Sequence, residues 1–450
     1  MTIESISHMI DSIRIEAPMA DPTLRERLLA DHDAIPTSAL RRLWRTGRSA
    51  LGVGAALVRS RRGDELDLSQ LEGVVHELGG LKGVAMKVGQ MLGYLDAGMP
   101  PELRQMMSTL QTAAPSAPLE EVHEVLREAL GERAQALIDT LEPAPLAVAS
   151  IGQVHRACLP DGTQVIVKVR HRGIEAALRA DFRSASLGKV FAAIAGTPAI
   201  RDIIEEARTA FLEECDFELE ASRQQRFGEI FADDPDVVIP AIEPAWCGPG
   251  VLVARFVGGR SLAEFLATAP AQAERDRIGG ALFRFWVRTL YREGLFHADP
   301  HPGNFAILDD GRVALYDFGC VRQFDRPLLQ GFARLGEATR RDDPAAMSAA
   351  IAGLGGVPPG DDAGREHLRQ LLRGFFGPLL HEGARAIAAD EGFEARTIMR
   401  DKLAVGRLQL PGRTLFLFRL RFGLYAVLAQ LGAVLDWSAL ERSWARALVA

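Results

Sequence analysis

Apolar residues along most of the chain recur at the three- and four-residue spacing that predicts amphipathic helices. The clearest run covers residues 67–95, and the glycines inside it indicate close approach of another backbone. Between residues 137 and 170 the pattern changes to strand, loop, strand, turn and strand, and another strand is predicted over residues 251–257. Further helices are predicted over residues 103–110, 119–130, 201–227, 275–293, 366–380, 394–405 and 414–435.

Residues 294–319 contain two polar clusters joined by a short apolar hairpin. Residues 305–308 and 312–316 read as two short strands around a turn at residues 309–311. Pairing of these strands brings Asn304 and Asp317 to the same end of the hairpin.

The polar residues around the hairpin match a signature of phosphoryl transfer. Protein kinases carry His-Arg-Asp, an asparagine five residues after that aspartate, and then Asp-Phe-Gly. Here His297-Ala298-Asp299 supplies the first element, Asn304 follows Asp299 by five residues, and Asp317 opens an Asp-Phe-Gly. Asn304 and Asp317 offer the oxygen ligands that suit Mg²⁺, and Asp299 suits orientation of the acceptor. A polar turn with an unrelated Asp-Phe-Gly is the alternative, but the hairpin and the spacing together favour a catalytic site.

A lysine-bearing strand and an acidic helix precede this stretch. Lys168 stands near the end of an apolar strand over residues 164–169, as does the kinase lysine that binds the α- and β-phosphates. A solvated strand end is the ordinary role of such a lysine. A kinase also needs a helix glutamate to hold the lysine, and Glu220 or Glu214 within residues 201–227 is suited to that role. Gly258-Gly259 follows the strand over residues 251–257 and marks a predicted hinge between two lobes.

The residues after Gly319 turn helical almost at once. The long activation segment and the Ala-Pro-Glu of protein kinases, which dock protein substrates, are not found in the sequence. We therefore expect a substrate other than a protein.

Composition and charge limit the partners and the cell compartment that we expect for this chain. The chain has 450 residues, 48% of them hydrophobic, and a net charge of −7 without a strong basic block, so nucleic acid is not an expected partner. The four cysteines are far apart and lack a Cys-x-x-Cys, which indicates a reducing cytosol. The N-terminus lacks the apolar run of a signal peptide. Arg419 and Arg421 interrupt the segment over residues 415–435, which we interpret as a buried or amphipathic helix. Residues 47–63 form either a basic helix that contacts a membrane surface or a linker helix.

These residues together resemble the UbiB (AarF-domain) family of atypical kinase-like proteins, over about residues 65–435. Lys87-Val88-Gly89-Gln90 matches the family's KxGQ motif, although Lys87 alone would read as a surface lysine. The alanine-rich loop that replaces the kinase glycine-rich loop is matched by Ala147, Val148, Ala149 and Ser150. The ExD motif is matched by Glu214-Cys215-Asp216, the strand lysine by Lys168, its partner by Glu220, and the catalytic and metal positions by Asp299, Asn304 and Asp317.

The resemblance implies an α+β, atypical protein-kinase-like two-lobed fold with an N-terminal helical extension and extra C-terminal helices. The implied division is an N-terminal polar segment, the KxGQ extension, an N-lobe, a C-lobe and C-terminal helices, over residues 1–63, 64–135, 136–260, 261–410 and 411–450. The family implies ATP and Mg²⁺ as cofactors and an ATPase-like activity coupled to isoprenoid-lipid metabolism, typically quinone biosynthesis. It implies no protein phosphorylation in trans, and a lipid or quinone-precursor ligand. We expect a cytoplasmic protein whose contact with the inner membrane, if it has one, is peripheral.

Within that resemblance, the predicted catalytic residues are Asp299, Lys168, Glu220, Lys87 and Glu214, and the predicted metal ligands are Asn304, Asp317 and Asp216. Lys87 and Glu214 are expected to pair near the γ-phosphate. Nucleotide contacts are predicted at the alanine-rich loop, Lys168, Gln90, Arg255 and Val257. Two positions depart from the family: Val148 replaces an alanine and crowds the loop, and Arg255 replaces an acidic hinge residue. The alternatives are a small-molecule phosphotransferase of the aminoglycoside or choline kinase type, and a nucleotide-binding scaffold without turnover.

Overall fold

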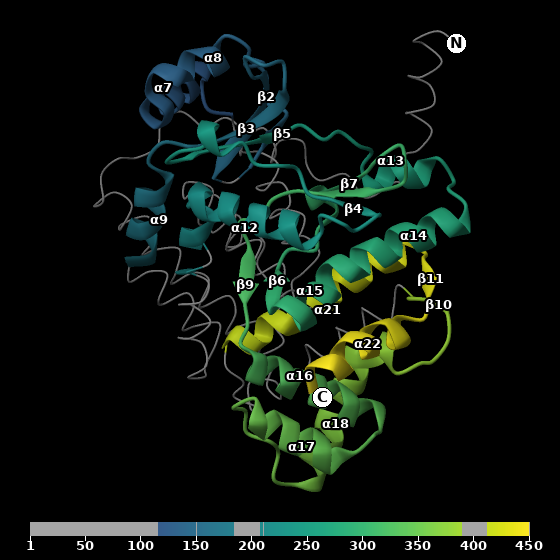
Figure 1. Cartoon of the computed structure of the whole chain (residues 1–450). Helices are drawn as coiled ribbons and strands as arrows, with labels where there is room; N and C mark the ends of the chain where they lie inside the picture. Colours follow the sequence, from purple (N-terminus) through teal and green to yellow (C-terminus); the bar gives the residue numbers. More distant parts are fainter. Residues whose placement is uncertain (1–115, 150, 184–207, 210, 389–411, 450) are drawn as a thin grey trace, which may run out of the picture. The chain divides into compact units, whose positions relative to one another are not determined.

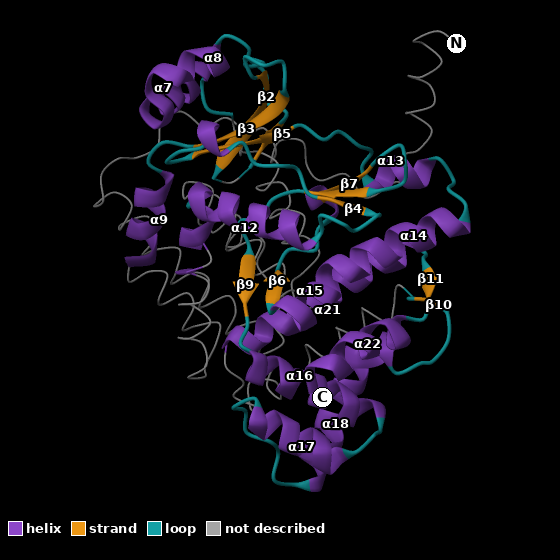
Figure 2. Cartoon of the chain, in the orientation of Figure 1, coloured by secondary structure: helices purple, strands orange, loops and turns teal. Residues whose placement is uncertain are grey.

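The computed structural model describes residues 116–149, 151–183, 208–209, 211–388 and 412–449. Both helices and β-strands appear in this part of the chain (Figures 1 and 2), which confirms the expected α+β class. The first section is a four-stranded antiparallel sheet in the order β1-β2-β3-β5. Its strands are β1 (Ala147–Val148), β2 (Gly152–Cys158), β3 (Gln164–Arg170) and β5 (Val251–Arg255).

Strand alternation gives this sheet two different faces. Val165, Val167 and Val169 of β3 pack with Val251 and Val253 of β5 against helix α7 (Leu119–Leu130) and the short helix α8 (Ala134–Ile138), which follows η1 (Gly131–Arg133). The residues between them in the sequence face the opposite side. There, Leu252 and Ala254 pack with α9 (Ile174–Arg183) and with the start of α12 (Phe217–Ile230). In Figure 1, α7 and α8 lie on one side of β2, β3 and β5, and α12 lies on the other. Lys168 of β3 lies on the α12 side of the sheet, between Ile166 and Arg170 on the same face.

The chain leaves the sheet through a hinge that packs tightly on a second sheet. This sheet has the order β4-β8-β7, with β4 (Val237–Val238) parallel to β8 (Val313–Leu315) and β7 (Phe305–Ile307) antiparallel to it. A side chain on Gly259 would come within 2.9 Å of the Ala306 Cβ, so only glycine allows this close approach. Arg260 and Ile307 exchange backbone hydrogen bonds of 2.9 and 2.8 Å, which fix the hinge to β7.

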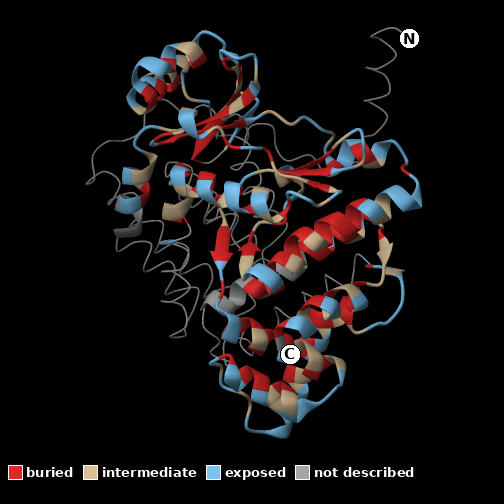
Figure 3. Cartoon of the chain, viewed as in Figure 1, coloured by how far each residue is buried: buried red, intermediate tan, exposed pale blue. Residues whose placement is uncertain are grey.

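The remainder is mostly helical, and its core is formed by large aromatic and aliphatic side chains. Figure 3 shows in red the buried positions along these helices. Ser261 caps α13 (Leu262–Ala267) through a capping box with Glu264. A long buried segment then runs through α14 (Gln272–Phe283), the π-helical turn η3 (Arg284–Arg288) and α15 (Thr289–Glu293) to β6 (Leu295–His297), which pairs with β9 (Val321–Gln323). The other elements are η2 (Pro244–Trp246), η4 (Pro302–Asn304), α16 (Arg326–Arg340), α17 (Pro344–Gly353), α18 (Asp362–Phe376), η5 (Gly377–Leu379), β10 (Arg385–Ala386), α21 (Gly412–Leu431), β11 (Val434–Leu435) and α22 (Trp437–Val449).

An acidic loop ahead of β4 ties this helical section to the second sheet. Asp236 accepts hydrogen bonds from Arg277 at 2.7 Å and from Arg284 at 2.5 Å, and Asp234 also pairs with Arg284 at 3.3 Å. Burial works against ionisation of Asp236, but the two arginines outweigh it and lower the pKa of this carboxyl below its ordinary value. The loop is thus held by charge-assisted hydrogen bonds.

Helix α21 supports the stretch that carries the polar motifs. A side chain on Gly423 would come within 2.5 Å of Pro300, so the helix packs directly on the residue after Asp299. Leu424, Val427 and Leu428 of this helix are buried, which agrees with the interpretation of the segment as a buried helix. Among the described residues, no helix combines the length and the apolar character needed to cross a bilayer.

Two secondary-structure elements predicted from the sequence differ in detail from those in the structure. The helix predicted over residues 201–227 breaks at Cys215, because Asp216 takes an extended backbone and caps a new helix, α12, by accepting the Leu219 N–H at 2.9 Å. The first strand predicted after residue 137 is instead the end of α8, whose Leu137 is buried in the core beside α7. The predicted helix over residues 394–405 lies outside the described residues, and the division into segments stays a prediction.

Candidate active site

A buried ion pair between the sheet and α12 forms the centre of the site. The Lys168 Nζ lies 2.7 and 2.8 Å from the two Glu220 carboxylate oxygens, and the side chains are only 9% and 2% exposed. Glu220 sits one turn into α12, where the Asp216 cap fixes the start of the helix. The lysine also lies over the Phe217 ring, 5.0 Å from its centroid. Of the two glutamates considered from the sequence, Glu220 therefore holds the lysine.

The electrostatics of the pair come from burial and from neighbouring carboxylates. Burial alone would lower the pKa of Lys168, but the carboxylates of Asp317, Glu220 and Glu214 outweigh it and raise that pKa. Burial raises the pKa of Glu220, and the lysine opposes that rise. The lysine therefore stays charged at neutral pH and presents a cation on the face of the sheet that packs against α12.

Asp317 reaches the same cation from the second half of the site. Its Oδ1 lies 3.7 Å from the Lys168 Nζ. Asp317 has a φ of +57°, a left-handed conformation that costs a non-glycine residue about 1 to 2 kcal/mol. Its Oδ1 accepts the Gly319 N–H at 3.1 Å, which stabilises the turn locally. A strained backbone conformation that is stabilised in this way indicates that the direction of the Asp317 side chain is important for function.

The His297 ring holds the backbone of both Asp317 and Asp299 by hydrogen bonds. Its Nε2 donates to the Asp317 carbonyl oxygen at 2.7 Å, and its Nδ1 accepts the Asp299 N–H at 3.4 Å. A carbonyl only accepts and an N–H only donates, so the ring is the neutral Nε2–H tautomer. Burial among Phe227, Phe285 and Phe318 lowers the pKa of His297 and keeps it neutral, although Asp317 and Asp299 oppose this.

Asn304 and Asp299 are joined by hydrogen bonds of their own. The Asn304 Nδ2 donates to the Asp299 Oδ2 at 2.8 Å and to the Asp299 carbonyl at 3.1 Å. Because the amide nitrogen is engaged there, the amide oxygen is the end of Asn304 left to act as a ligand. The Tyr316 N–H donates to the Asn304 carbonyl at 2.8 Å, so the hairpin brings Asn304 next to Asp317 as the sequence predicted.

The oxygen donors of Asn304 and Asp317 are of the kind that fits Mg²⁺. The described residues contain no group of three or more histidine, cysteine, aspartate or glutamate side chains that could hold a metal ion. Asn304 and Asp317 offer one amide oxygen and one carboxylate, and Mg²⁺ is commonly held by one or two carboxylates with waters and substrate phosphates. Asp216 lies at the start of α12, exposed, with its carboxylate capping the helix.

A second layer of charges, which the sequence analysis did not single out, holds the Asp-Phe-Gly turn. Arg223 of α12 donates to the Gly319 carbonyl at 2.9 Å and pairs with Glu213 at 2.6 Å. Arg322 of β9 pairs with the same Glu213 oxygen, also at 2.6 Å. The signal in the sequence was the position of Arg223, three residues after Glu220 and so on a neighbouring part of the same helix surface. Glu214 lies beside this turn, since a side chain on Gly319 would meet the Glu214 Cγ at 3.6 Å.

The predicted nucleotide contacts are only partly described. Ala147 and Val148 are exposed on β1, and the Ala149 N–H donates to the Gly152 carbonyl at 2.8 Å to close a tight turn. Ser150, Lys87 and Gln90 lie outside the described residues.

The predicted hinge contacts at Arg255 and Val257 are engaged with protein groups. The Arg255 N–H donates to the Ala241 carbonyl at 2.8 Å, and its side chain pairs with Glu243 at 2.7 Å. The Val257 carbonyl accepts from the Tyr316 hydroxyl at 2.8 Å, which links the hinge to the catalytic hairpin.

Comparison with known proteins places this geometry in context. The family model described as "ABC1 atypical kinase-like domain" matches residues 109–350. The chain is similar to the "Atypical kinase COQ8, mitochondrial" of Saccharomyces cerevisiae, with 27% identity over 71% of this chain and 66% of that protein. It is also similar to the chloroplastic "Protein ACTIVITY OF BC1 COMPLEX KINASE 8" of Arabidopsis thaliana, with 30% identity over 61% of this chain and 37% of that protein. The matched part thus spans less than two thirds of these relatives' own length.

A solved structure shares the arrangement of elements. The Rv3197–erythromycin complex from Mycobacterium tuberculosis aligns with a TM-score of 0.58 and 28% identity, covering 83% of this chain and 95% of that one.

Proposed function

We propose that this chain, which belongs to the ABC1 atypical kinase-like family, is an Mg²⁺-dependent ATPase or small-molecule phosphotransferase. The observation that carries the proposal is the convergence of Lys168 on both Glu220 and Asp317, at 2.7 and 3.7 Å. A cation fixed between the sheet and an Asp-Phe-Gly turn has the charge and the place needed to bind phosphates.

Each side chain then has a defined part. Lys168, held by Glu220, binds the α- and β-phosphates of ATP. Asn304 and Asp317 would hold Mg²⁺, which neutralises charge on the phosphate oxygens when bound. Asp299, positioned by Asn304, accepts the proton of the attacking hydroxyl or water. His297 sets the direction of both aspartates without taking part in proton transfer.

The short segment after the Asp-Phe-Gly turn favours a substrate other than a protein. Helix α16 begins at Arg326, only a few residues after Gly319, and β9 occupies half of the interval. Protein kinases use a much longer segment here as a docking surface. Isoprenoid-lipid metabolism of the ubiquinone type, at a membrane surface, is the setting we infer from the family resemblance.

Lys87 of the KxGQ motif has a proposed role in the same reaction. We propose that it pairs with Glu214 near the γ-phosphate and restricts access by large substrates, because Glu214 lies beside the Asp-Phe-Gly turn. Lys87→Ala should change the hydrolysis rate or admit acceptors that the parent rejects. Hydrolysis and acceptor range identical to those of the parent would contradict this role.

The main test is ATP hydrolysis by the purified chain with and without Mg²⁺ and anionic liposomes. We expect hydrolysis that requires Mg²⁺, increases with liposomes, and is abolished in Asp317→Asn. Hydrolysis that requires a small alcohol or amine acceptor, and ignores liposomes, would favour the aminoglycoside or choline kinase type. ATP binding without turnover under every condition would leave only the scaffold.

A further inference from the structure

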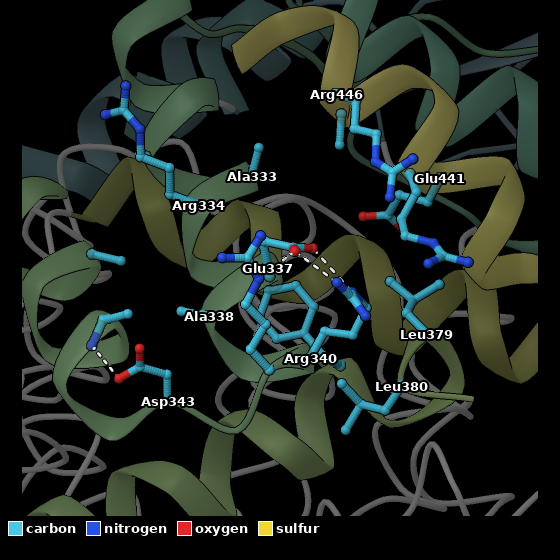
Figure 4. Close-up of a pocket in the computed structure, with 18 of the residues that line it drawn as sticks. Ala333, Arg334, Glu337, Ala338, Arg340, Asp343, Leu379, Leu380, Glu441 and Arg446 are labelled. Atoms are coloured by element: carbon cyan, nitrogen blue, oxygen red, sulfur yellow. Dashed lines mark hydrogen bonds and ion pairs between the residues drawn. The ribbon is translucent and has the colours of Figure 1, made fainter. Parts of the chain in front are cut away.

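The helical section contains a cavity of about 780 Å³ that is separate from the residues of the candidate active site. It is lined by α16, α17, α22 and the segment around η5 (Figure 4). Its volume lies within the range of about 300 to 1,000 Å³ that small-molecule sites occupy. None of Lys168, Glu220, Asp299, Asn304 and Asp317 contributes to its lining.

The wall of the cavity is apolar and is formed largely by small side chains. Ala346, Ala349 and Gly353 of α17 line one side, and Phe376, Leu379 and Leu380 line another. The glycines of α16 have a different role: a side chain on Gly331 would come within 2.9 Å of Leu354, so this glycine serves packing. The space therefore comes from the alanines of α17, whose short side chains leave the cavity open.

The charges around the cavity are basic in excess. Five arginines and three carboxylates line it, a net charge of +2 in a chain whose net charge is −7. Glu337 pairs with both Arg340 and Arg341, with oxygen to nitrogen distances of 2.7 Å to each, and Arg442 pairs with Glu382 at 3.1 Å.

Arg334 and Arg446 are different, because neither forms an ion pair or hydrogen bond within the described residues. They project from α16 and α22 on two sides of the cavity (Figure 4), and both are exposed. Two guanidinium groups that have no partner in the described part of the chain, at the edge of an apolar cavity, provide planar donors for a carboxylate or a phosphate.

A buried hydroxyl adds a polar position inside the lining. Ser438 is 1% exposed, and its Oγ has no hydrogen-bond partner within the described residues. Buried hydroxyl groups are nearly always hydrogen-bonded, so an unpartnered one in a cavity wall indicates a missing partner. Tyr291 and Glu441 nearby satisfy each other, with the hydroxyl 2.7 Å from the carboxylate.

We propose that this cavity binds an anionic amphiphile, whose apolar part lies against α17 and η5 and whose carboxylate or phosphate lies at the edge of the cavity, paired with Arg334 or with Arg446. The two sources of such chemistry are a fatty acid and a prenyl phosphate.

The test measures binding of palmitate and farnesyl phosphate to the full chain by equilibrium dialysis, below their micelle concentrations. Farnesol and dodecyltrimethylammonium are the neutral and cationic controls. We expect at least one anion to bind at least ten-fold more tightly than either control, and the preferred anion identifies the source. Failure of both anions to bind, or equal binding of farnesol and farnesyl phosphate, would overturn the proposal.

Two pairs of variants locate the site. Arg334→Gln with Arg446→Gln should weaken anion binding at least ten-fold. Arg365→Gln with Arg373→Gln removes the same charge at two positions of α18 that do not line the cavity, and should leave binding unchanged. Ala349→Trp fills the cavity from an exposed position and should abolish binding, whereas Ala352→Trp on the same helix should not. Thermal unfolding confirms that each variant is folded, and unaltered binding in Ala349→Trp would place the ligand elsewhere.

Discussion

Glu220→Gln tests the central ion pair with the smallest change of shape. The substitution removes one charge from a pair whose side chains are almost fully buried, and it keeps one oxygen as an acceptor for Lys168. At 2.7 Å and an effective dielectric constant of about 20, the attraction that is lost is roughly 6 kcal/mol before desolvation is considered. Relief of the buried carboxylate's desolvation offsets part of this loss.

The net effect on stability should be smaller than the lost attraction. Breaking a buried pair by removing one partner usually costs about 3 to 5 kcal/mol. Asp317 still lies 3.7 Å from the lysine, although its side chain is half exposed and therefore screened. We expect the free energy of unfolding to fall by about 3 kcal/mol. We also expect Mg²⁺-dependent ATP hydrolysis to fall at least 100-fold, because the lysine turns toward Asp317 and away from the phosphates.

Urea denaturation and steady-state ATP hydrolysis measure the two effects. Glu218→Gln is the matched control, since Glu218 lies on the same helix but is exposed, and it should change neither quantity. The double variant Lys168→Met with Glu220→Leu should recover stability without activity, because two apolar side chains replace a buried pair. Parental hydrolysis in Glu220→Gln, with the protein folded, would refute the reasoning.

Three further results are expected. Arg223→Ala should lower kcat for ATP hydrolysis about ten-fold with little change in KM and remove about 1 to 3 kcal/mol of stability, because the Asp-Phe-Gly turn loses a charge-assisted hydrogen bond. Substitution of the exposed Arg226 by alanine is the control, and an equal fall in kcat there would contradict a positioning role for Arg223. Asn304→Ala should raise the Mg²⁺ concentration for half-maximal hydrolysis and lower kcat about 100-fold; an unchanged Mg²⁺ titration would exclude it as a ligand. The folded-state pKa of Asp236 lies below its ordinary value, so the stability that Asp236 contributes is present above about pH 4 and is lost as pH falls through the folded pKa. Urea denaturation at pH 7 and pH 3 measures this loss. The free energy of unfolding should fall less between the two pH values in Asp236→Asn than in the parent.

The α+β fold and the family resemblance could be predicted from the sequence, and both are confirmed. Local patterns carried this success: the hairpin over residues 305–315 needs only alternating apolar residues and a turn, and α7 begins and ends at the predicted residues. Such features depend on neighbours in the chain, so a sequence reading finds them.

Features that depend on distant partners were harder to predict. The break at Cys215 follows from the Asp216 cap, but the same residues also fit a continuous acidic helix. The choice of Glu220 over Glu214 depends on where α12 meets β3, which no local pattern encodes. Arg223 and Glu213 act across the turn at Gly319, and their partners lie about 100 residues away.

The brief connection between Gly319 and α16 also bears on regulation. Its residues, Cys-Val-Arg-Gln-Phe-Asp, include no serine, threonine or tyrosine. Many kinases switch on when a phosphate added to this stretch recruits arginines and orders the loop. Here a carboxylate already present in the chain, that of Glu213, gathers Arg223 and Arg322 around the same turn. The fold thus supplies permanently the negative charge that other members of the wider kinase class receive as a covalent signal.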